Sequence, residues 1–350
     1  MKLAYITYTF ITFVVNLSAV FCAGAFIYTF VKTDLELCLY ALLHIVAHSA
    51  IVYIQIAACL LQNKIKTDIF DHLSAIYAAN EKKDHFRYLV AANTKSEWVW
   101  SFFFKFAVFG YLVNNVSMCA FPAILCWKRG QGFDVKYLYH PFKVLLPWKQ
   151  STLFGYLAEV FYGTFLCEVF IVATGSVLCL FMSMSWHHEA FLYIFRHSTR
   201  KLELIRDEKH ANDIVCNLVR FHIVVKEWFL ESANVYSSFI LIQLICSMIS
   251  MTCVVFQLDL QLKRFDFSVG LLVSCGLVGV ANLFLFCYFG KLATQSFEGM
   301  SDALYESDWP ELSVRLQKYF IIMVGNTQKS IFYNGFGVAV LNLETFTNVS

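Results

Sequence analysis

Two histidines of the chain have a spacing that could support metal chemistry. His44 and His48 lie four residues apart in an apolar stretch, so a helix would place both rings on one face. Zinc sites use imidazole nitrogens in this way. The zinc-protease pattern His-Glu-x-x-His is absent, because no Glu follows His44. A structural or pocket role therefore fits these histidines better than a metal site.

Ionisable residues within apolar stretches form a second group of chemical interest. Lys105, Glu159 and Glu168 lie in such stretches, where a charge is costly and usually faces protein or water. Glu159 lies roughly 9 Å along its helix from the expected outer end. Tyr156 and Tyr162 flank it at three-residue spacing, on adjoining faces. Either Glu159 lines an outer cavity, or its carboxyl group is protonated or paired and holds helices together.

No enzyme motif accompanies these residues. The sequence contains no Gly-Lys-Ser/Thr phosphate loop, no Gly-x-Gly-x-x-Gly and no Gly-x-Ser-x-Gly nucleophile elbow. We therefore predict no enzyme activity and no cofactor. The net charge is only +2, and no basic patch is interleaved with aromatic residues, so we also expect no nucleic-acid partner.

The elements that position these residues follow from composition. Hydrophobic residues make up 59% of the 350 residues and charged residues 15%, against roughly 45–50% and about 25% in soluble domains. The mean hydropathy is +0.60. These values are typical of a polytopic membrane protein.

Six apolar stretches are long enough to cross a bilayer of about 30 Å as helices. They are approximately Leu3–Val31, Leu35–Leu61, Trp98–Trp127, Leu153–Met184, Tyr236–Leu258 and Phe267–Phe289. The run from Ile331 supplies a seventh. We thus predict an all-α membrane protein with seven transmembrane helices.

The distribution of Lys and Arg predicts the orientation. With the N-terminus inside, the inner segments contain 18 basic residues and the outer loops 8, with Lys105 left within a span. The positive-inside rule therefore favours an inside N-terminus. Two inner segments, 62–97 and 185–235, mix charges with apolar residues at helical spacing. We interpret them as cytoplasmic extensions of the membrane helices that pack together.

The C-terminal fifty residues carry an ordered set of motifs. Ser301-Asp302-Ala303-Leu304-Tyr305 is followed by Asp308-Trp309-Pro310-Glu311, which predicts a helix start. Apolar residues then recur at helical spacing until Gly325. Gln328-Lys329 follows, and the chain ends in Leu341-Asn342-Leu343-Glu344-Thr345-Phe346 and four further residues. This order resembles the C-terminal signature of insect odorant receptors, although Ser330 replaces the Pro often found after the Gln-Lys pair.

The resemblance implies an arrangement of three parts. Residues 1–300 would form a six-helix ligand-binding bundle with cytoplasmic extensions, and 301–330 a cytoplasmic anchor helix. Residues 331–350 would begin a pore-lining helix, the membrane half of a split seventh segment, whose continuation is missing here. The implied anchor and pore residues are Trp309, Gln328, Lys329, Thr345 and Phe346.

The resemblance also implies a ligand site in the outer halves of the second, third, fourth and sixth segments. A pocket for a small apolar ligand is mostly apolar and aromatic with a few polar anchors. The candidates at this depth are Tyr40, His44, His48, Asn114, Met118, Tyr156, Glu159, Tyr162 and Ser274. Composition alone shows only that they share a membrane depth, and aromatic residues in spans also serve ordinary helix packing.

The function implied by the resemblance is that of a tuning subunit of a ligand-gated, nonselective cation channel. It would assemble with the family's shared co-receptor into a heterotetramer in the plasma membrane of olfactory sensory neurons, and bind small volatile ligands. A gustatory receptor is a related alternative, but its terminal motif is not found. A secondary transporter would predict inverted repeats and paired broken helices, and neither is present in the sequence.

We predict that the N-terminus lies on the cytoplasmic side, because of the excess of basic residues in the segments assigned to the inside. An epitope fused at Met1 should be stained only after the cells are permeabilised. Staining of intact cells would contradict both the orientation and the family resemblance.

Overall fold

The computed structural model describes residues 2–128, 130, 146–148, 151–204, 207–262, 268–328, 331–337 and 339–349. Within these ranges, the side chains of some helical residues are outside the description; they are 2–6, 35–37, 114–115, 117–119, 121–123, 125–126, 203–204, 261, 268–272, 274–275, 339, 345 and 348–349.

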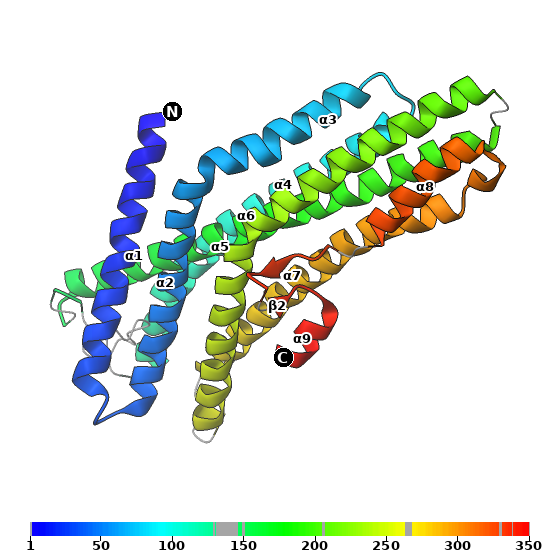
Figure 1. Cartoon of the computed structure of the whole chain (residues 1–350). Coiled ribbons are helices and arrows are strands. Elements are labelled where there is room, and N and C mark those ends of the chain that lie inside the picture. The colour runs from blue at the N-terminus through cyan, green and yellow to red at the C-terminus, as the bar shows by residue number, and fades with distance from the viewer. Residues whose placement is uncertain are drawn as a thin grey trace. The chain divides into compact units, whose positions relative to one another are not determined.

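Long helices account for most of the described chain, which confirms the all-α prediction (Figure 1). The helices are α1 (Lys2–Phe30), α2 (Leu35–Lys64), α3 (His72–Asn80), α4 (Phe86–Lys128), α5 (Leu153–Arg200), α6 (Glu208–Leu262), α7 (Ser268–Tyr305), α8 (Val314–Thr327) and α9 (Leu343–Val349). A π-helical segment, η1 (Ile65–Asp71), joins α2 to α3, and short 3₁₀ turns follow α5 (η3, Lys201–Leu204) and α7 (η4, Trp309–Glu311).

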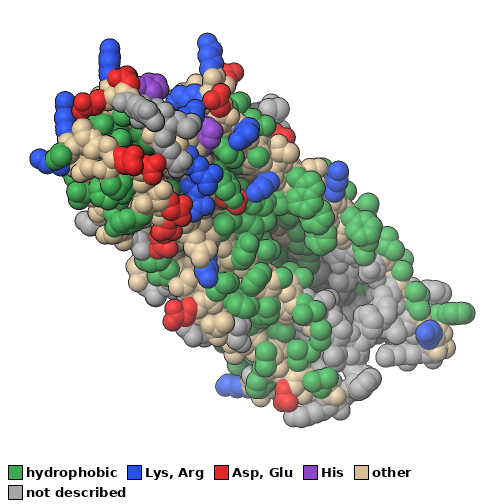
Figure 2. Space-filling model, turned by 90° about the vertical axis from the view of Figure 1, so that its right-hand side faces the viewer, with side chains coloured by type: hydrophobic (Ala, Val, Ile, Leu, Met, Phe, Trp, Pro, Cys, Tyr) green, Lys and Arg blue, Asp and Glu red, His purple; other side chains and the backbone are tan. Residues whose placement is uncertain are grey.

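The six apolar stretches predicted as spans fall within α1, α2, α4, α5, α6 and α7. Among the described residues, five helical segments are long and apolar enough to cross a membrane. On α4, the side chains of Phe102, Phe106 and Phe109 are exposed and recur at helical spacing. Figure 2 shows hydrophobic side chains covering much of one face, with most of the charged side chains gathered in another region and a few scattered elsewhere. This segregation is expected of a protein that meets both lipid and water.

The described chain divides into two compact units. The first unit comprises Met1–Ala58, Ser101–Val177 and Gln243–Ala281, and the second comprises Cys59–Trp100, Leu178–Ile242 and Asn282–Ser350. Four of the long helices, α2, α4, α5 and α6, contribute to both units. The same is true of α7, which passes from the first unit to the second at Asn282.

In the first unit, α1 and the beginning of α2 lie antiparallel, joined by a turn at 31–34 (Figure 1). Ala23, Phe26 and Ala41 form a buried cluster between them. Elsewhere in this unit, small residues allow close approach. A Cβ atom at Gly276 of α7 would lie 3.3 Å from Val254 Cγ1 of α6. Small residues are typical of helix contacts in membranes.

In the second unit, α5 and α6 pack together through aromatic rings, as predicted for segment 185–235. Phe191 of α5 contacts the Phe221 and Trp228 rings of α6 at centroid distances of 6.0 and 5.3 Å. Phe191, Trp228 and the neighbouring Phe229 are fully buried. Aromatic pairs of this kind add about 0.5–1.5 kcal/mol each beyond area burial. Helix α8 lies alongside the last part of α7 (Figure 1).

The helix start predicted at Asp308 is a short 3₁₀ turn, in which the Asp308 side chain makes no capping hydrogen bond, and the α-helix begins only after it. Residues Trp309–Glu311 form a 3₁₀ turn, Leu312 is extended, and α8 begins after Ser313. The Gln317 side chain donates to the carbonyl oxygens of Pro310 and Leu312, at 2.7 and 2.9 Å. These bonds satisfy carbonyls that a continuous helix would have used internally. The described part of the predicted anchor segment, 301–328, is therefore the end of α7, a 3₁₀ turn and α8 rather than one helix.

The predicted helix from Ile331 is also wrong over its first twelve residues. Strands β1 (Asn334–Gly335) and β2 (Ala339–Val340) form an antiparallel hairpin, with Asn334 opposite Val340. Phe336 and Gly337 have φ values of 51° and 76°, and the Gly337 N–H donates to Asn334 Oδ1 at 2.8 Å. Positive φ at two central residues is typical of a tight hairpin turn. Among the described residues from Ile331 onward, only those of α9 are helical.

The hairpin packs against α7 at a glycine. A Cβ atom at Gly290 would lie 2.6 Å from Leu341 Cβ and 2.9 Å from the Leu341 carbonyl oxygen. Because the backbone of Leu341 cannot move aside cheaply, we predict that Gly290→Ala lowers the free energy of unfolding by about 1–3 kcal/mol. Thermal unfolding of the purified protein measures this change.

Gly325→Ala is the matched control, because no atom lies within 4 Å of the position of its Cβ. In α8 this substitution should be neutral or slightly stabilising. Equal unfolding midpoints for the two variants would contradict the close packing of the hairpin on α7.

Candidate functional site

In the first unit, a buried hydrogen-bonded pair joins α1 to α2. His48 Nδ1 lies 2.9 Å from Asn16 Oδ1, and the Asn16 Nδ2 group donates to the Thr12 carbonyl oxygen at 2.7 Å. Because the Asn16 amide nitrogen is used in this way, its oxygen must accept from a protonated His48 Nδ1. Both side chains are buried. His48 is thus fixed in tautomer and position by α1.

A second polar contact joins α1 to α5. The Tyr162 hydroxyl lies 2.9 Å from Ser18 Oγ, and the Ser18 hydroxyl also donates to the Val15 carbonyl oxygen at 2.7 Å. The Tyr162 ring packs edge-on against Trp148, with 5.9 Å between centroids. Farther along α1, Gln55 of α2 donates to Thr12 Oγ1 at 2.9 Å. The polar residues of α1 therefore organise both neighbouring helices.

The predicted α5 residues lie on the interior face of that helix. Glu159 is 0% exposed and Tyr156 is 4% exposed. On the other side of α5, Phe154, Leu157 and Phe161 are exposed. Because these two sets alternate with helical spacing, Glu159 faces the interior of the first unit, away from the apolar surface. This burial is common to both interpretations of Glu159, as a pocket residue and as a packing residue.

The remaining predicted ligand residues lie on α2, α4 and α7. Tyr40 and His44 are half-buried on α2, and the His44 and His48 rings stack with a centroid distance of 5.9 Å. Asn114 and Met118 lie on α4 and Ser274 on α7, but their side chains are outside the described residues. Among the described residues, no group of three or more His, Cys, Asp and Glu side chains could hold a metal ion.

The sequence interpretation missed the contribution of α1. Asn16, Ser18 and Thr12 were not among the predicted site residues, yet they hold His48, Tyr162 and Gln55. A signal was present, because Thr12, Asn16 and Ser18 lie close together in a largely apolar span. Polar residues in membrane helices usually face the bundle interior and bond to other helices.

In the second unit, the C-terminal motifs contact α7 at two places, at its end and near Phe284. Gln328 Nε2 donates to the Tyr305 hydroxyl at 3.0 Å, and the Trp309 ring stacks on Phe320 at 6.4 Å. Phe346 of α9 contacts Phe284 of α7 edge-on at 5.5 Å. The spacing of the signature thus places α8 and α9 against α7. The predicted residue Lys329 and the Thr345 side chain are outside the described residues.

Tyr333 lies directly before β1, in the segment that leads into the hairpin (the hairpin segment), and is fully buried in this unit. Its hydroxyl lies 2.6 Å from Ser232 Oγ of α6 and 3.0 Å from His188 Nε2 of α5. Because the Ser232 hydroxyl donates to the Phe229 carbonyl oxygen, Tyr333 must donate to Ser232 and accept from His188 Nε2–H. One directed chain of hydrogen bonds therefore connects α5, the hairpin segment and α6.

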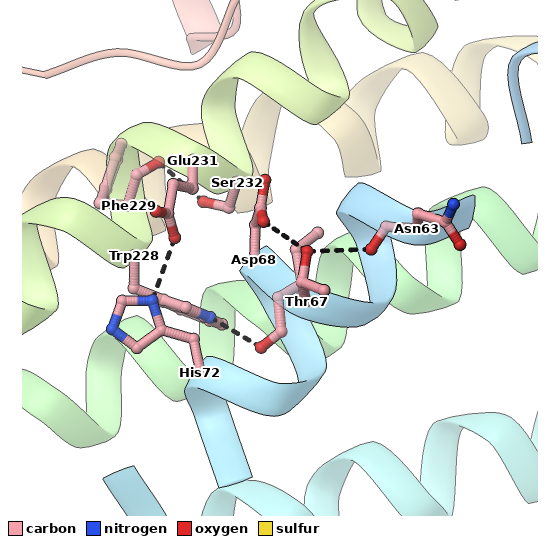
Figure 3. Close-up of polar contacts among 9 residues, drawn as sticks. Asn63, Thr67, Asp68, His72, Trp228, Phe229, Glu231 and Ser232 are labelled. Carbon is pink, nitrogen blue, oxygen red and sulfur yellow. Dashed lines mark hydrogen bonds and ion pairs between the residues drawn. The ribbon is translucent and has the colours of Figure 1, made fainter. Parts of the chain in front are cut away.

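The π-helical segment η1 is held by α6 in the same unit (Figure 3). Trp228 Nε1 donates to the Ile69 carbonyl oxygen at 3.1 Å, and His72 Nδ1 lies 3.0 Å from Glu231 Oε2. Figure 3 shows Trp228 and Glu231 approaching η1 and the start of α3 from one side. A π-helical turn replaces the i to i−4 backbone hydrogen bonds of an α-helix with longer-range ones. Here the indole N–H of Trp228 donates to one of the carbonyl oxygens of that turn.

A cluster of basic and imidazole groups lies where α4 begins and α5 ends. Burial, followed by the positive charges of Lys83, His197 and Lys201, lowers the pKa of His85 to about 4. His85 Nε2 bonds to Asn80 Oδ1 at 3.0 Å. The imidazole is therefore neutral near pH 7 and becomes charged only in strongly acidic solution.

Comparisons with known proteins place this geometry in context. A family model described as 7tm Odorant receptor matches residues 41–350. Odorant receptor 85b of Drosophila melanogaster is 22% identical over 201 residues, or 55% of this chain and 49% of that protein. The matched region thus spans about half the length of this curated relative.

The fold is similar to that of the insect olfactory receptor OR5 from Machilis hrabei. The TM-scores are 0.74 for one structure and 0.77 for its complex with eugenol, with sequence identities of 14% and 13%. Each match covers 98% of this chain and 85% of the other. At these identities the similarity concerns the fold.

We predict that Tyr333→Phe lowers the free energy of unfolding by about 1–3 kcal/mol, because it leaves the buried Ser232 and His188 groups without their partner. Chemical denaturation of the purified protein measures the change. The matched control is Tyr193→Phe on α5, whose exposed hydroxyl lies 3.4 Å from Glu189 Oε1. A loss as large in the control as in Tyr333→Phe would contradict the buried chain of hydrogen bonds.

Proposed function

The chain belongs to the seven-transmembrane odorant receptor family, and from that premise we propose that it is the odorant-binding subunit of a ligand-gated, nonselective cation channel. The family model covers residues 41–350, well over half of the chain, and this observation carries the proposal. The chain is a multi-pass membrane protein of a receptor family. Membership in that family agrees with the prediction that it is not an enzyme.

The proposed ligands are small, volatile and mostly apolar molecules. The related OR5 structure was solved with eugenol, a ligand of that protein. In this chain, the interior face of the first unit offers Tyr156 and Glu159 as buried polar groups among apolar side chains. Such a lining, with few polar anchors, suits a small apolar ligand. His48 and Tyr162 would shape the site from positions fixed by α1.

The proposed assembly is a heterotetramer with the family's shared co-receptor, in the plasma membrane of olfactory sensory neurons. The C-terminal segment would take part in the pore, and α8 in subunit contacts. The exposed apolar side chains of Val314, Ile321 and Ile322 on α8 support a contact of this kind. Its opposite face, with Leu316, Phe320 and Met323, is buried within the second unit.

The test is electrical. Cells that express the chain with the co-receptor should show a nonselective cation current when exposed to a panel of volatile compounds, and cells with the chain alone should not. Uptake of a compound at fixed stoichiometry, without such a current, would contradict the channel and favour a transporter.

Within this assay, we predict that Glu159→Gln shifts the half-maximal ligand concentration by up to about tenfold, because it replaces an oxygen of the carboxyl group with an NH2 donor and so alters a buried hydrogen bond, which typically contributes about 0.5–1.5 kcal/mol. Glu168→Gln is the matched control on the same helix and should leave the dose–response unchanged. If Glu159→Gln loses surface expression while its rescued fraction responds normally, Glu159 serves packing rather than ligand binding.

A further inference from the structure

A small polar cavity lies between the ends of α5 and α7 in the second unit. Its volume is about 190 Å³, and it is lined by Arg196, Thr199, Arg200, Ala303, Glu306 and Ser307. Helices α5 and α7 approach closely beside it. A Cβ atom at Gly299 would lie 3.0 Å from Leu192 Cδ2 and 3.7 Å from Arg196 Nη2. The cavity is therefore a defined feature of a packed helix pair.

The volume of the cavity limits what it can hold. It corresponds to roughly six water molecules at about 30 Å³ each. Pockets for whole organic ligands usually have about 300–1,000 Å³ and a mostly apolar lining. The polar lining of this cavity suits a single charged group with its first substituent atoms better than an apolar molecule.

The hydrogen-bond donors of the cavity come from the two arginines. Arg196 Nε is enclosed and has no hydrogen-bond partner in the part of the chain that the structure describes. Arg200 follows one turn later on the same face of α5 and is exposed. The hydroxyl groups of Thr199 and Ser307 donate to the carbonyl oxygens of Arg196 and Leu304, at 2.9 and 2.8 Å. The unused donors are therefore guanidinium N–H groups.

Guanidinium groups are suited to bidentate binding of phosphate oxygens. Two features oppose it. Glu306 brings a carboxylate to the exposed rim, and α5 and α7 both end here with the negative ends of their dipoles. The two dipole ends, at about half a charge each, and the Glu306 carboxylate together equal the charge of the two arginines, so the fork geometry of the guanidinium donors, rather than net charge, favours a phosphate group here.

We propose that Arg196 and Arg200 bind the phosphate group of a phosphate monoester in this cavity. Such a group carries about −1.5 to −2 charges at pH 7 and several acceptor oxygens. It would accept from the guanidinium N–H groups of Arg196 and Arg200 that line the cavity and join the end of α5 to residues 303–307. This site is separate from the interior face of the first unit on which the proposed odorant binding rests.

Two sources could supply the phosphate: a soluble phosphate ester or the headgroup of a phosphoinositide lipid. The first arm of the test titrates the purified full chain in detergent with inositol trisphosphate, at constant ionic strength. The second arm uses the chain in phosphatidylcholine nanodiscs with and without phosphatidylinositol bisphosphate. Saturable binding in the first arm identifies a soluble ligand as sufficient, and binding only in the second identifies the lipid.

Charge variants decide whether the cavity is the site. Arg196→Gln and Arg200→Gln should each weaken binding about tenfold, and Glu306→Gln should tighten it, because it removes the opposing carboxylate. Lys201→Gln is the matched control, since Lys201 neighbours Arg200 but pairs with Asp84 at 3.3 Å and does not line the cavity. It should change binding less than about threefold.

The proposal is overturned if neither arm shows binding, if Lys201→Gln weakens binding as much as the arginine variants, or if Glu306→Gln weakens it. Arg200 is exposed, so Arg200→Gln should fold normally and keeps the test decisive even if Arg196→Gln does not fold. Odorant-evoked current in the same variants is a separate measurement, and its loss or retention bears on the proposed function alone.

Discussion

A buried tyrosine hydroxyl must find its hydrogen bonds inside the protein, and this constraint organises the second unit. Tyr333 is 0% exposed, and its hydroxyl donates to Ser232 and accepts from His188. Its ring packs on Phe181 and Phe229, each at a centroid distance of 5.0 Å. An unpaired hydroxyl here would cost about 1–3 kcal/mol, so the hairpin segment has one favoured position against α5 and α6.

The hairpin that follows depends on this position. Gly290 of α7 and Gly335 of β1 permit backbone contacts with Leu341 and Leu241 that a larger residue would block. The Phe336 N–H donates to Ser237 Oγ of α6 at 2.7 Å, and α9 then reaches α7 through Phe346. The C-terminal signature of the family is therefore a set of packing contacts in this chain. Residues proposed to contribute to the pore are connected through Tyr333 to the long helices α5 and α6.

In the first unit the corresponding constraint is the satisfaction of polar groups within apolar helices. Asn16 and Ser18 of α1 engage His48 and Tyr162, so two of the predicted ligand residues have structural partners. Tyr156 and Glu159 lie on the interior face of α5. The contacts with α1 therefore hold His48 and Tyr162 in position at the proposed odorant site, whereas Tyr156 and Glu159 of α5 supply its buried polar groups. Helix α5 continues from the first unit into the second. The proposed ligand site and the contacts of the C-terminal segment therefore share this helix.

The sequence alone determined the fold class, the positions of the six apolar spans and the family, because hydrophobic length and a fixed order of local motifs are one-dimensional properties. It also placed Glu159, Tyr156 and Tyr162 together, since helical spacing fixes which residues share a face. It did not find the role of α1, because the pairing of Asn16 with His48 joins residues 32 positions apart. Nor did it find the hairpin at 334–340, where apolar composition suggested a helix. The backbone there is set by positive φ at two residues and by contacts with α6 and α7, and only the tertiary structure decides such contacts.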